Sequence, residues 1–151
     1  MSDIDDLIAA INADKRRFAQ VIWPPASPEA IERLRRFARD TLRTKLPEGY
    51  VTFLGKSDGL AFNDYEIYAA TEHKEPNLSG FVEVNEILGG PDGRYAFYGE
   101  CGIDFYAQDR TSMAWVTLDR PSLSVMATFP SFDAMLARVL RDATSILFRP
   151  K

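Results

Sequence analysis

The sequence contains few of the residues that catalysis or covalent cross-linking usually requires. Its 151 residues include one cysteine, Cys101, and one histidine, His73. A single cysteine excludes an internal disulfide, and one histidine without a nearby cysteine or second histidine cannot build a zinc site. We therefore expect no metal, no cofactor, an inert buried thiol at Cys101 and a solvated histidine in a polar loop.

Longer signatures of function are also absent from the sequence. No apolar run approaches the length that crosses a membrane, and the first residues are acidic, unlike those of a signal peptide. The Gly-x-Ser-x-Gly elbow of hydrolases is missing, and the glycine-rich stretch 89–93 lacks the Lys-Ser/Thr ending of a phosphate loop. These absences predict a cytoplasmic protein that is not an enzyme, with residues 89–93 as a turn.

The composition suits a single globular domain with an aromatic-rich core. Hydrophobic residues make up 46% of the chain and include ten Phe, six Tyr and two Trp. The net charge is −4, but residues 58–109 alone contain two basic and eleven acidic residues, a net charge of −9. Such an acidic segment is unsuited to binding nucleic acid, because contacts to phosphates need Lys and Arg. It is either a solvated surface or a patch that steers a basic protein partner.

The N-terminal third of the chain predicts three helices. Residues 3–20 carry an apolar stripe behind Ser2 as N-cap, and a second helix has Ser27 as its cap and Pro28 at its first position. Arginines line one face of the second helix and could contact RNA, but the interleaved acids and the absence of an aromatic platform favour a solvated face. A short third helix begins at Pro47.

The rest of the chain predicts a sheet followed by a C-terminal helix. Residues 65–129 contain strand-length segments joined by short connectors, which implies an antiparallel meander of four or more strands. Residues 81–88 are ambiguous between strand and helix. In the predicted strand 103–108, alternation puts Asp104 and Tyr106 on one face, so one face meets the core and the other meets water. The expected fold class is α+β.

The stretch LPEGYVTFLGKSDGLAFNDYEIY, residues 46–68, resembles the N-terminal signature of the SUKH superfamily. That signature is a Leu-Pro step, an aromatic, a short apolar helix, an Asn/Asp-Gly turn and a strand ending in an aromatic. The matching residues are Leu46, Pro47, Tyr50, Phe53, Leu54, Asp58, Gly59, Ile67 and Tyr68. Four later segments resemble the YrhA-like branch of the superfamily: GFVEVNEIL, FYAQD, MAWVTLDRP and FPSFDAMLARVL. The resemblance covers residues 28–147 and leaves 1–27 as an extra helix and proline-rich connector.

This resemblance implies a binding fold without catalysis. Bacterial SUKH proteins act mainly as immunity proteins, which neutralise a cognate polymorphic toxin in the cytoplasm of the producing cell. Toxins of this kind are often nucleases with a basic surface, which the acidic middle segment would suit. One alternative is a regulatory or scaffold protein, like the fungal cell-wall assembly regulator of the same superfamily. Another is a small hydrolase built on surface acids.

Partner contacts are expected on the exposed face of the meander and in the loops that border it. The candidate partner-binding residues are Asp58, Asp64, Glu100, Asp104 and Tyr106. Their carboxylates would contact Lys or Arg of a toxin, and the tyrosine would supply amphipathic contact area. The sequence predicts no catalytic residue, no metal ligand, and no direct nucleic-acid or membrane partner.

Overall fold

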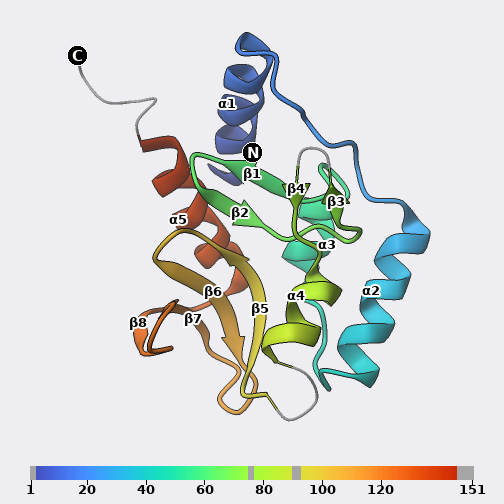
Figure 1. Ribbon diagram of the computed structural model, residues 1–151, viewed down its shortest axis with the longest axis vertical. Helices are drawn as coiled ribbons and strands as arrows, with labels where there is room; N and C mark the ends of the chain where they lie inside the picture. The colour runs from blue at the N-terminus through green and yellow to red at the C-terminus, as the bar shows by residue number, and fades with distance from the viewer. Residues whose placement is uncertain (1–2, 75–76, 90–92, 146–151) are drawn as a thin grey trace.

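The computed structural model describes residues 3–74, 77–89 and 93–145 (Figure 1). The predicted cap Ser2, part of the predicted turn 89–93 and the end of the last predicted helix lie outside these ranges. The helices are α1 (Asp3–Arg17), α2 (Pro28–Asp40), α3 (Glu48–Leu54), α4 (Phe81–Leu88) and α5 (Phe132–Thr144). The strands are β1 (Leu60–Phe62), β2 (Tyr65–Ile67), β3 (His73–Lys74), β4 (Asn77–Leu78), β5 (Tyr95–Glu100), β6 (Asp104–Asp109), β7 (Trp115–Asp119) and β8 (Val125–Phe129).

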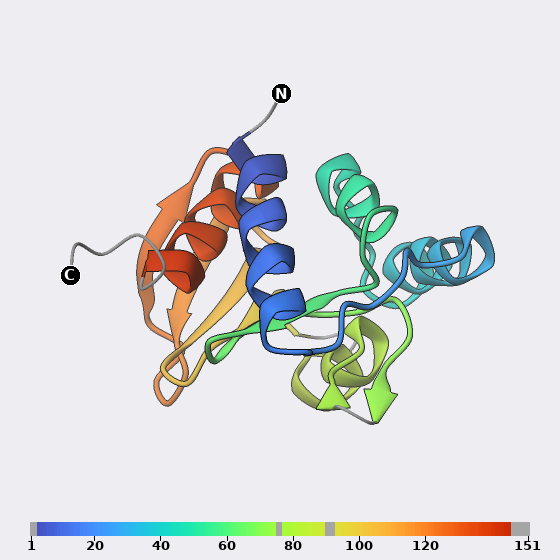
Figure 2. The same cartoon turned by 90° about the horizontal axis from the view of Figure 1, so that it is seen from above.

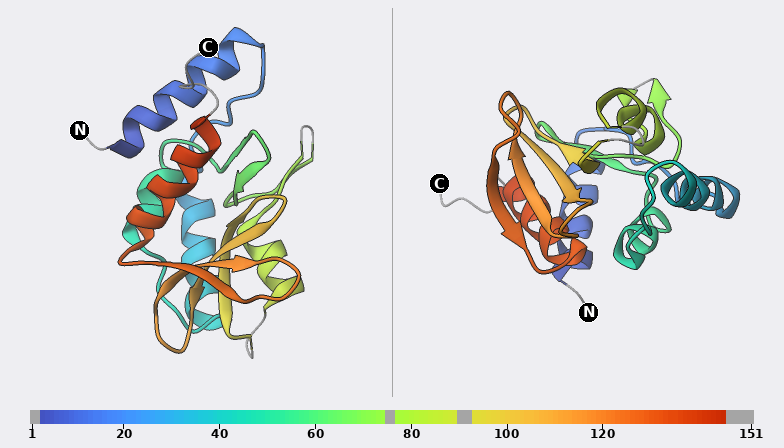
Figure 3. Two further views of the ribbon diagram at one scale, coloured as in Figure 1. Left: turned by 90° about the vertical axis from the view of Figure 1, so that its left-hand side faces the viewer. Right: turned by 90° about the horizontal axis from the view of Figure 1, so that it is seen from below.

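Six strands form one antiparallel sheet in the order β1-β2-β5-β6-β7-β8. Strands β5 to β8 are the meander that the sequence predicts, and β8 lies at the outer edge of the sheet (Figure 3). Strands β3 and β4 form a separate two-stranded ribbon. Helices precede the sheet and one helix follows it, so the predicted α+β fold is confirmed.

The first two strands, β1 and β2, form a tight hairpin that was not predicted from the sequence. Its turn residues, Asn63 and Asp64, have φ of 49° and 71°, in the left-handed region that Asn and Asp tolerate best after glycine. The Asn63 side-chain amide also donates to the carbonyl of Ala143 in α5 at 2.9 Å. At three residues, β1 is too short to show the alternation by which a strand is predicted.

The corner between α3 and the sheet matches the prediction for residues 46–68. Pro47 precedes α3 as its N-cap, and the stripe of Tyr50, Phe53 and Leu54 is buried. Gly59 then adopts a φ of +83°, and a Cβ there would lie 2.8 Å from a methyl carbon of Leu78. Both the backbone angle and the close approach therefore require glycine at this turn.

The ambiguous segment 81–88 is helix α4, and a buried asparagine fixes it to the sheet. Asn85 donates to the carbonyl oxygens of Phe81 and Phe97 and accepts from the Phe97 amide. Phe97 stands where the β5–β6 register shifts, so its backbone groups need another partner. Val82 and Val84, the valines of this segment, are partly buried and pack against the core from different sides of the helix.

Aromatic rings join the helices to the sheet in one core. Tyr98 of β5 lies 4.9 Å from Phe81, 5.1 Å from Tyr50 and 5.3 Å from Trp115, measured between ring centres. Phe132 of α5 completes the cluster. Helices α1 and α5 lie side by side over the sheet (Figure 2), and buried residues of both belong to this core.

The prediction that one face of strand 103–108 meets water is wrong. From the second residue of β6 onward every side chain is buried. Gln108, which alternation places on the same face as Tyr106, accepts a hydrogen bond from the Thr44 hydroxyl, because the loop after α2 folds over this end of the strand. The most exposed strand is instead the edge strand β8, where Met126 is 63% exposed.

Candidate functional site

Asp58, a predicted partner-binding residue, is buried and holds two loops together. Its side chain accepts a hydrogen bond from the Ala70 amide at 2.7 Å and lies 3.0 Å from Nε2 of His73. The ring of Trp23 packs beside His73, with 5.6 Å between ring centres. His73 is therefore half-buried and paired, not the solvated loop residue that the sequence suggested. Because only 6% of Asp58 is exposed, it is unavailable to a partner.

Tyr106 is also buried, which removes it from the predicted surface. It is 4% exposed, and its hydroxyl donates to Sγ of Cys101 at 3.6 Å. Burial, followed by this contact, raises the pKa of the Tyr106 hydroxyl far above its usual value. Cys101 itself is a buried free thiol, as predicted.

Glu100, the last residue of β5, belongs to a half-buried network of hydrogen bonds. One carboxylate oxygen accepts from the Tyr68 hydroxyl at 2.8 Å, and the other accepts from Arg120 at 2.6 Å. Its cross-strand neighbour Glu66 has a raised pKa, chiefly because burial penalises its charge, while the Ser79 amide donates to it at 2.5 Å. These partners occupy both carboxylate oxygens of Glu100 within the fold, so Glu100 can lie only at the margin of a binding surface.

The two remaining candidates, Asp64 and Asp104, lie in a group of acids that we name the acidic edge. The acidic edge consists of Asp64, Asp104, Asp119 and Asp142. The charges of Asp64, Asp104 and Asp142 act on the Tyr65 hydroxyl, and those of Asp119 and Asp142 act on Asp104. Asp104 and Asp119 are directly paired across strands β6 and β7, and Asp142 comes from the last turn of α5. Beside them Ile103 is 71% exposed.

Like charges crowd one another at this edge. The pKa of Asp104 is raised, first by partial burial and then by the nearby carboxylates of Asp119 and Asp142. The pKa of Tyr65 is raised by burial and by the charges of Asp142, Asp104 and Asp64 among others. Two aspartates directly opposite each other destabilise a sheet. The fold compensates part of this charge, because Arg138 forms an ion pair with Asp142 and Ser122 donates two hydrogen bonds to Asp119. The cost in stability therefore falls mainly on Asp104, opposite Asp119.

Sequence reasoning missed Asp119 and Asp142. The pairing of Asp104 with Asp119 follows from the register of the β6–β7 hairpin, so the short connector between these strands was a usable signal. No signal in the sequence places Asp142 there, because its position depends on how α5 packs against the sheet.

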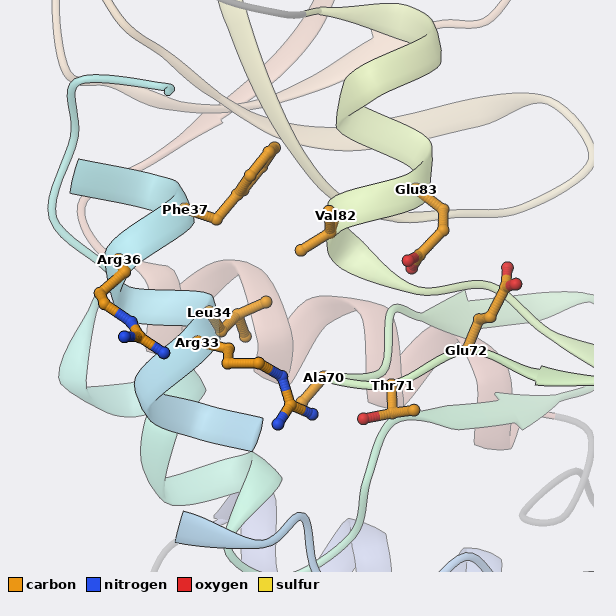
Figure 4. Close-up of a pocket in the computed structure, with 9 residues that line it drawn as sticks. All are labelled: Arg33, Leu34, Arg36, Phe37, Ala70, Thr71, Glu72, Val82 and Glu83. Atoms are coloured by element: carbon orange, nitrogen blue, oxygen red, sulfur yellow. The ribbon is translucent and has the colours of Figure 1, made fainter. Parts of the chain in front are cut away.

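A cleft of about 420 Å³ between α2 and α4, which we name the α2–α4 cleft, is the second candidate site (Figure 4). Its floor is apolar, its α2 rim carries two arginines and its opposite rim carries two glutamates. The lining residues are Arg33, Leu34, Arg36, Phe37, Ala70, Thr71, Glu72, Val82 and Glu83. Figure 4 shows the Arg33 guanidinium lying toward Ala70 and Thr71, and the carboxylates of Glu72 and Glu83 on the far side. An opening with both signs of charge around an apolar floor suits a ligand with matching groups.

The chain offers no recognisable metal site or membrane span in the residues described. No three His, Cys, Asp or Glu side chains lie where they could hold a metal ion within 3–74, 77–89 and 93–145. In the same ranges, no helix combines the length and apolar character needed to cross a membrane. Comparison with protein-family models and with curated protein sequences finds no match to this chain.

Proposed function

We propose that this protein is a non-catalytic protein-binding domain, a cytoplasmic immunity protein that neutralises a basic toxin by direct contact. The observation that carries the proposal is the acidic edge, where the directly paired Asp104 and Asp119 stand close to Asp142. The resemblance of residues 28–147 to the SUKH superfamily supports the same function.

The energetics of the acidic edge favour a cationic partner. Repulsion between the opposed carboxylates of Asp104 and Asp119 raises the free energy of the unbound protein, and a Lys or Arg of the partner relieves it on binding. Negative potential at one edge also speeds the encounter with a basic protein. Ile103 and Tyr65 add apolar and aromatic contact area beside the charges, as protein interfaces commonly do.

The proposed interface retains Asp64 and Asp104 from the sequence prediction and adds Asp119, Asp142 and Tyr65. Asp64 is exposed, and its carboxylate also accepts from the Gly102 amide at 2.8 Å, which holds the loop before β6 in place. Asp58 and Tyr106 are excluded by burial, and Glu100 lies beneath the surface in its own network.

The experiment measures association with the purified product of a toxin-like gene adjacent to the gene for this chain. Asp104→Lys should slow association about tenfold at low salt and by less at moderate salt, because steering is screened by ions. Glu32→Lys on exposed α2 changes the net charge by the same amount away from the acidic edge, and it should leave the rate nearly unchanged.

Equal rates for the two variants would contradict a role for the acidic edge. Asp104→Asn gives an independent check, because removing one charge of the repelling pair should weaken binding while leaving the folded protein as stable as before or slightly more so. A variant that loses binding only together with its stability would mean that Asp104 serves the fold alone.

A further inference from the structure

The α2–α4 cleft contains a carboxylate that the fold leaves unsatisfied. Glu83 is the third residue of α4, where a glutamate commonly reaches back to the residue that caps the helix. Here Oε1 is buried without any hydrogen-bond partner in the described residues. An unpaired buried acceptor costs stability, and a charged one costs more. Its presence beside an open cleft suggests that a donor arrives from outside.

The neighbouring backbone is shaped to keep this carboxylate in place. Gly80 caps α4 without a side chain, and a Cβ at that position would lie 1.9 Å from Oε1 of Glu83. Glycine therefore leaves the room in which the carboxylate lies. The same Cβ would come within 3.1 Å of Glu72, so Gly80 separates the two glutamates that border the cleft.

The opposite rim of the cleft carries two exposed positive charges, of which that of Arg36 also acts on the carboxylate of Asp40. Arg33 and Arg36 are exposed on α2 and form no hydrogen bond or ion pair with any described residue. Arg35 and Arg39, their neighbours on the helix, are instead paired with Glu48 and Asp40. The two guanidiniums that border the cleft are thus available, while adjacent arginines are not.

These features restrict the chemistry of a ligand. A purely cationic ligand would be repelled by Arg33 and Arg36, and a purely anionic one by the two glutamates. An uncharged apolar molecule would leave Glu83 unpaired. A molecule with an ammonium group, a carboxylate and an apolar body satisfies every group in the lining.

We propose that the α2–α4 cleft binds a small zwitterion, a free α-amino acid with a large apolar side chain. Its ammonium group meets Glu83 and Glu72, and its carboxylate meets the α2 arginines, for which a bidentate contact is the favoured geometry. The side chain lies on the floor formed by Leu34, Phe37 and Val82. Rotation about the last torsion of Glu83 presents either carboxylate oxygen to the ligand. The cavity volume is typical of small-molecule sites.

Calorimetric titration of the whole chain with phenylalanine, leucine and methionine tests the ligand class. All three amino acids should bind, and phenylalanine should bind at least tenfold more tightly than its own analogues lacking one charge, namely phenethylamine and 3-phenylpropionate. N-acetylphenylalanine amide represents an internal peptide residue and should also bind at least tenfold more weakly. Equal binding of any analogue, or no measurable heat with all three amino acids, would overturn the proposal.

Glu83→Gln tests the residue that carries the argument, with Glu86→Gln as its control. Glu86 is exposed on the same helix and does not line the cleft. Glu83→Gln should weaken phenylalanine binding at least tenfold without lowering the thermal unfolding midpoint, whereas Glu86→Gln should change neither. A lower midpoint with unchanged binding would mean that Glu83 is only a helix cap, and the proposal would fail.

Gly80→Ala provides a second variant that leaves every charge in place. The added methyl group must displace the Glu83 carboxylate, so phenylalanine binding should weaken at least tenfold. Unchanged binding in a folded variant would overturn the proposed position of the ammonium group. None of these titrations involves the acidic edge, so their results are independent of the proposed function.

Discussion

Two buried tyrosines of the aromatic core differ in whether the hydroxyl has a hydrogen-bond partner. Tyr50 and Tyr98 are both fully buried, and their ring centres lie 5.1 Å apart. The Tyr50 hydroxyl donates to the Tyr68 carbonyl at 2.6 Å, whereas the Tyr98 hydroxyl has no partner in the described residues. Burial raises the pKa of both hydroxyls, so both stay neutral donors near neutral pH.

This contrast predicts opposite effects of the same substitution. Tyr50→Phe should lower the free energy of unfolding by about 1–2 kcal/mol, because it removes a buried hydrogen bond and leaves a carbonyl short of a donor. Tyr98→Phe should leave stability unchanged or raise it by about 1 kcal/mol, because it removes an unsatisfied hydroxyl from an apolar site. Urea unfolding of both variants checks this, and a loss of more than about 1 kcal/mol in Tyr98→Phe would contradict it.

At the scale of elements, the meander is joined by two loops of the same design. The segments DRTSM and DRPSL begin with the last residues of β6 and β7, and each ends in an apolar residue with positive φ, Met113 at 66° and Leu123 at 58°. In each loop the leading aspartate accepts a hydrogen bond from a backbone amide further along. Of the two, Asp109 also forms an ion pair with an arginine, Arg94, which lies just before β5.

The ion pair with Arg94 makes the contribution of Asp109 to the free energy of unfolding depend on pH. Hydrogen bonds from Arg94 and from loop amides lower the pKa of Asp109 to about 2, against roughly 3.9 in an unfolded chain. A lowered pKa in the folded state stabilises the protein above the unfolded value, and this stabilisation is lost as pH falls toward the folded value. Since Arg94 is largely exposed, solvent screens part of the attraction.

Asp109→Asn should therefore lower the free energy of unfolding by about 1–2 kcal/mol at pH 7. The difference from the unmodified protein should shrink as pH falls from 5 to 2. Asp119→Asn is the matched control, since Asp119 begins the equivalent loop and faces other acids instead of an arginine. Denaturant unfolding over this pH range measures both, and a difference for Asp109→Asn that is independent of pH would rule out a contribution from the ion pair.

At the scale of the whole molecule, α1 belongs to the same core as the rest of the chain. Ile11 of α1 is fully buried, and α1 packs against α5, the last helix. An ion pair also joins these two helices, with Asp3 accepting from Arg141 at 2.8 Å. The N-terminal helix, on which the SUKH resemblance gives no guidance, thus covers apolar surface of α5.

This packing predicts that a core substitution in α1 lowers the stability of the whole protein. Ile11→Ala should lower the free energy of unfolding by about 2–4 kcal/mol, as expected for a cavity in a closed core. Ile87→Ala makes the same change at a residue that is 81% exposed and should cost less than about 1 kcal/mol. Tryptophan fluorescence and far-ultraviolet circular dichroism should give coincident transitions; separate ones would show that α1 unfolds by itself.

Elements that follow from local chemistry can be predicted from the amino-acid sequence alone. The Ser27-Pro28 start of α2, the apolar stripe of α3, the Gly59 turn and four meander strands with short connectors all appear as predicted. Caps, glycine turns and alternation act over a few residues, so a single sequence suffices to find them. The α+β class follows from the order of these elements.

Which side chains are buried and which acids lie close together depends instead on contacts between distant parts of the chain. Asp58 and Tyr106 looked exposed from their own strands and loops, but Ala70, His73 and Cys101 reach them from elsewhere in the chain. The acidic edge likewise needs β6, β7 and α5 in place, and the α2–α4 cleft needs two helices separated by the first strands. Burial and electrostatic coupling depend on every element packed against a residue, and periodicity along one segment carries no information about those neighbours.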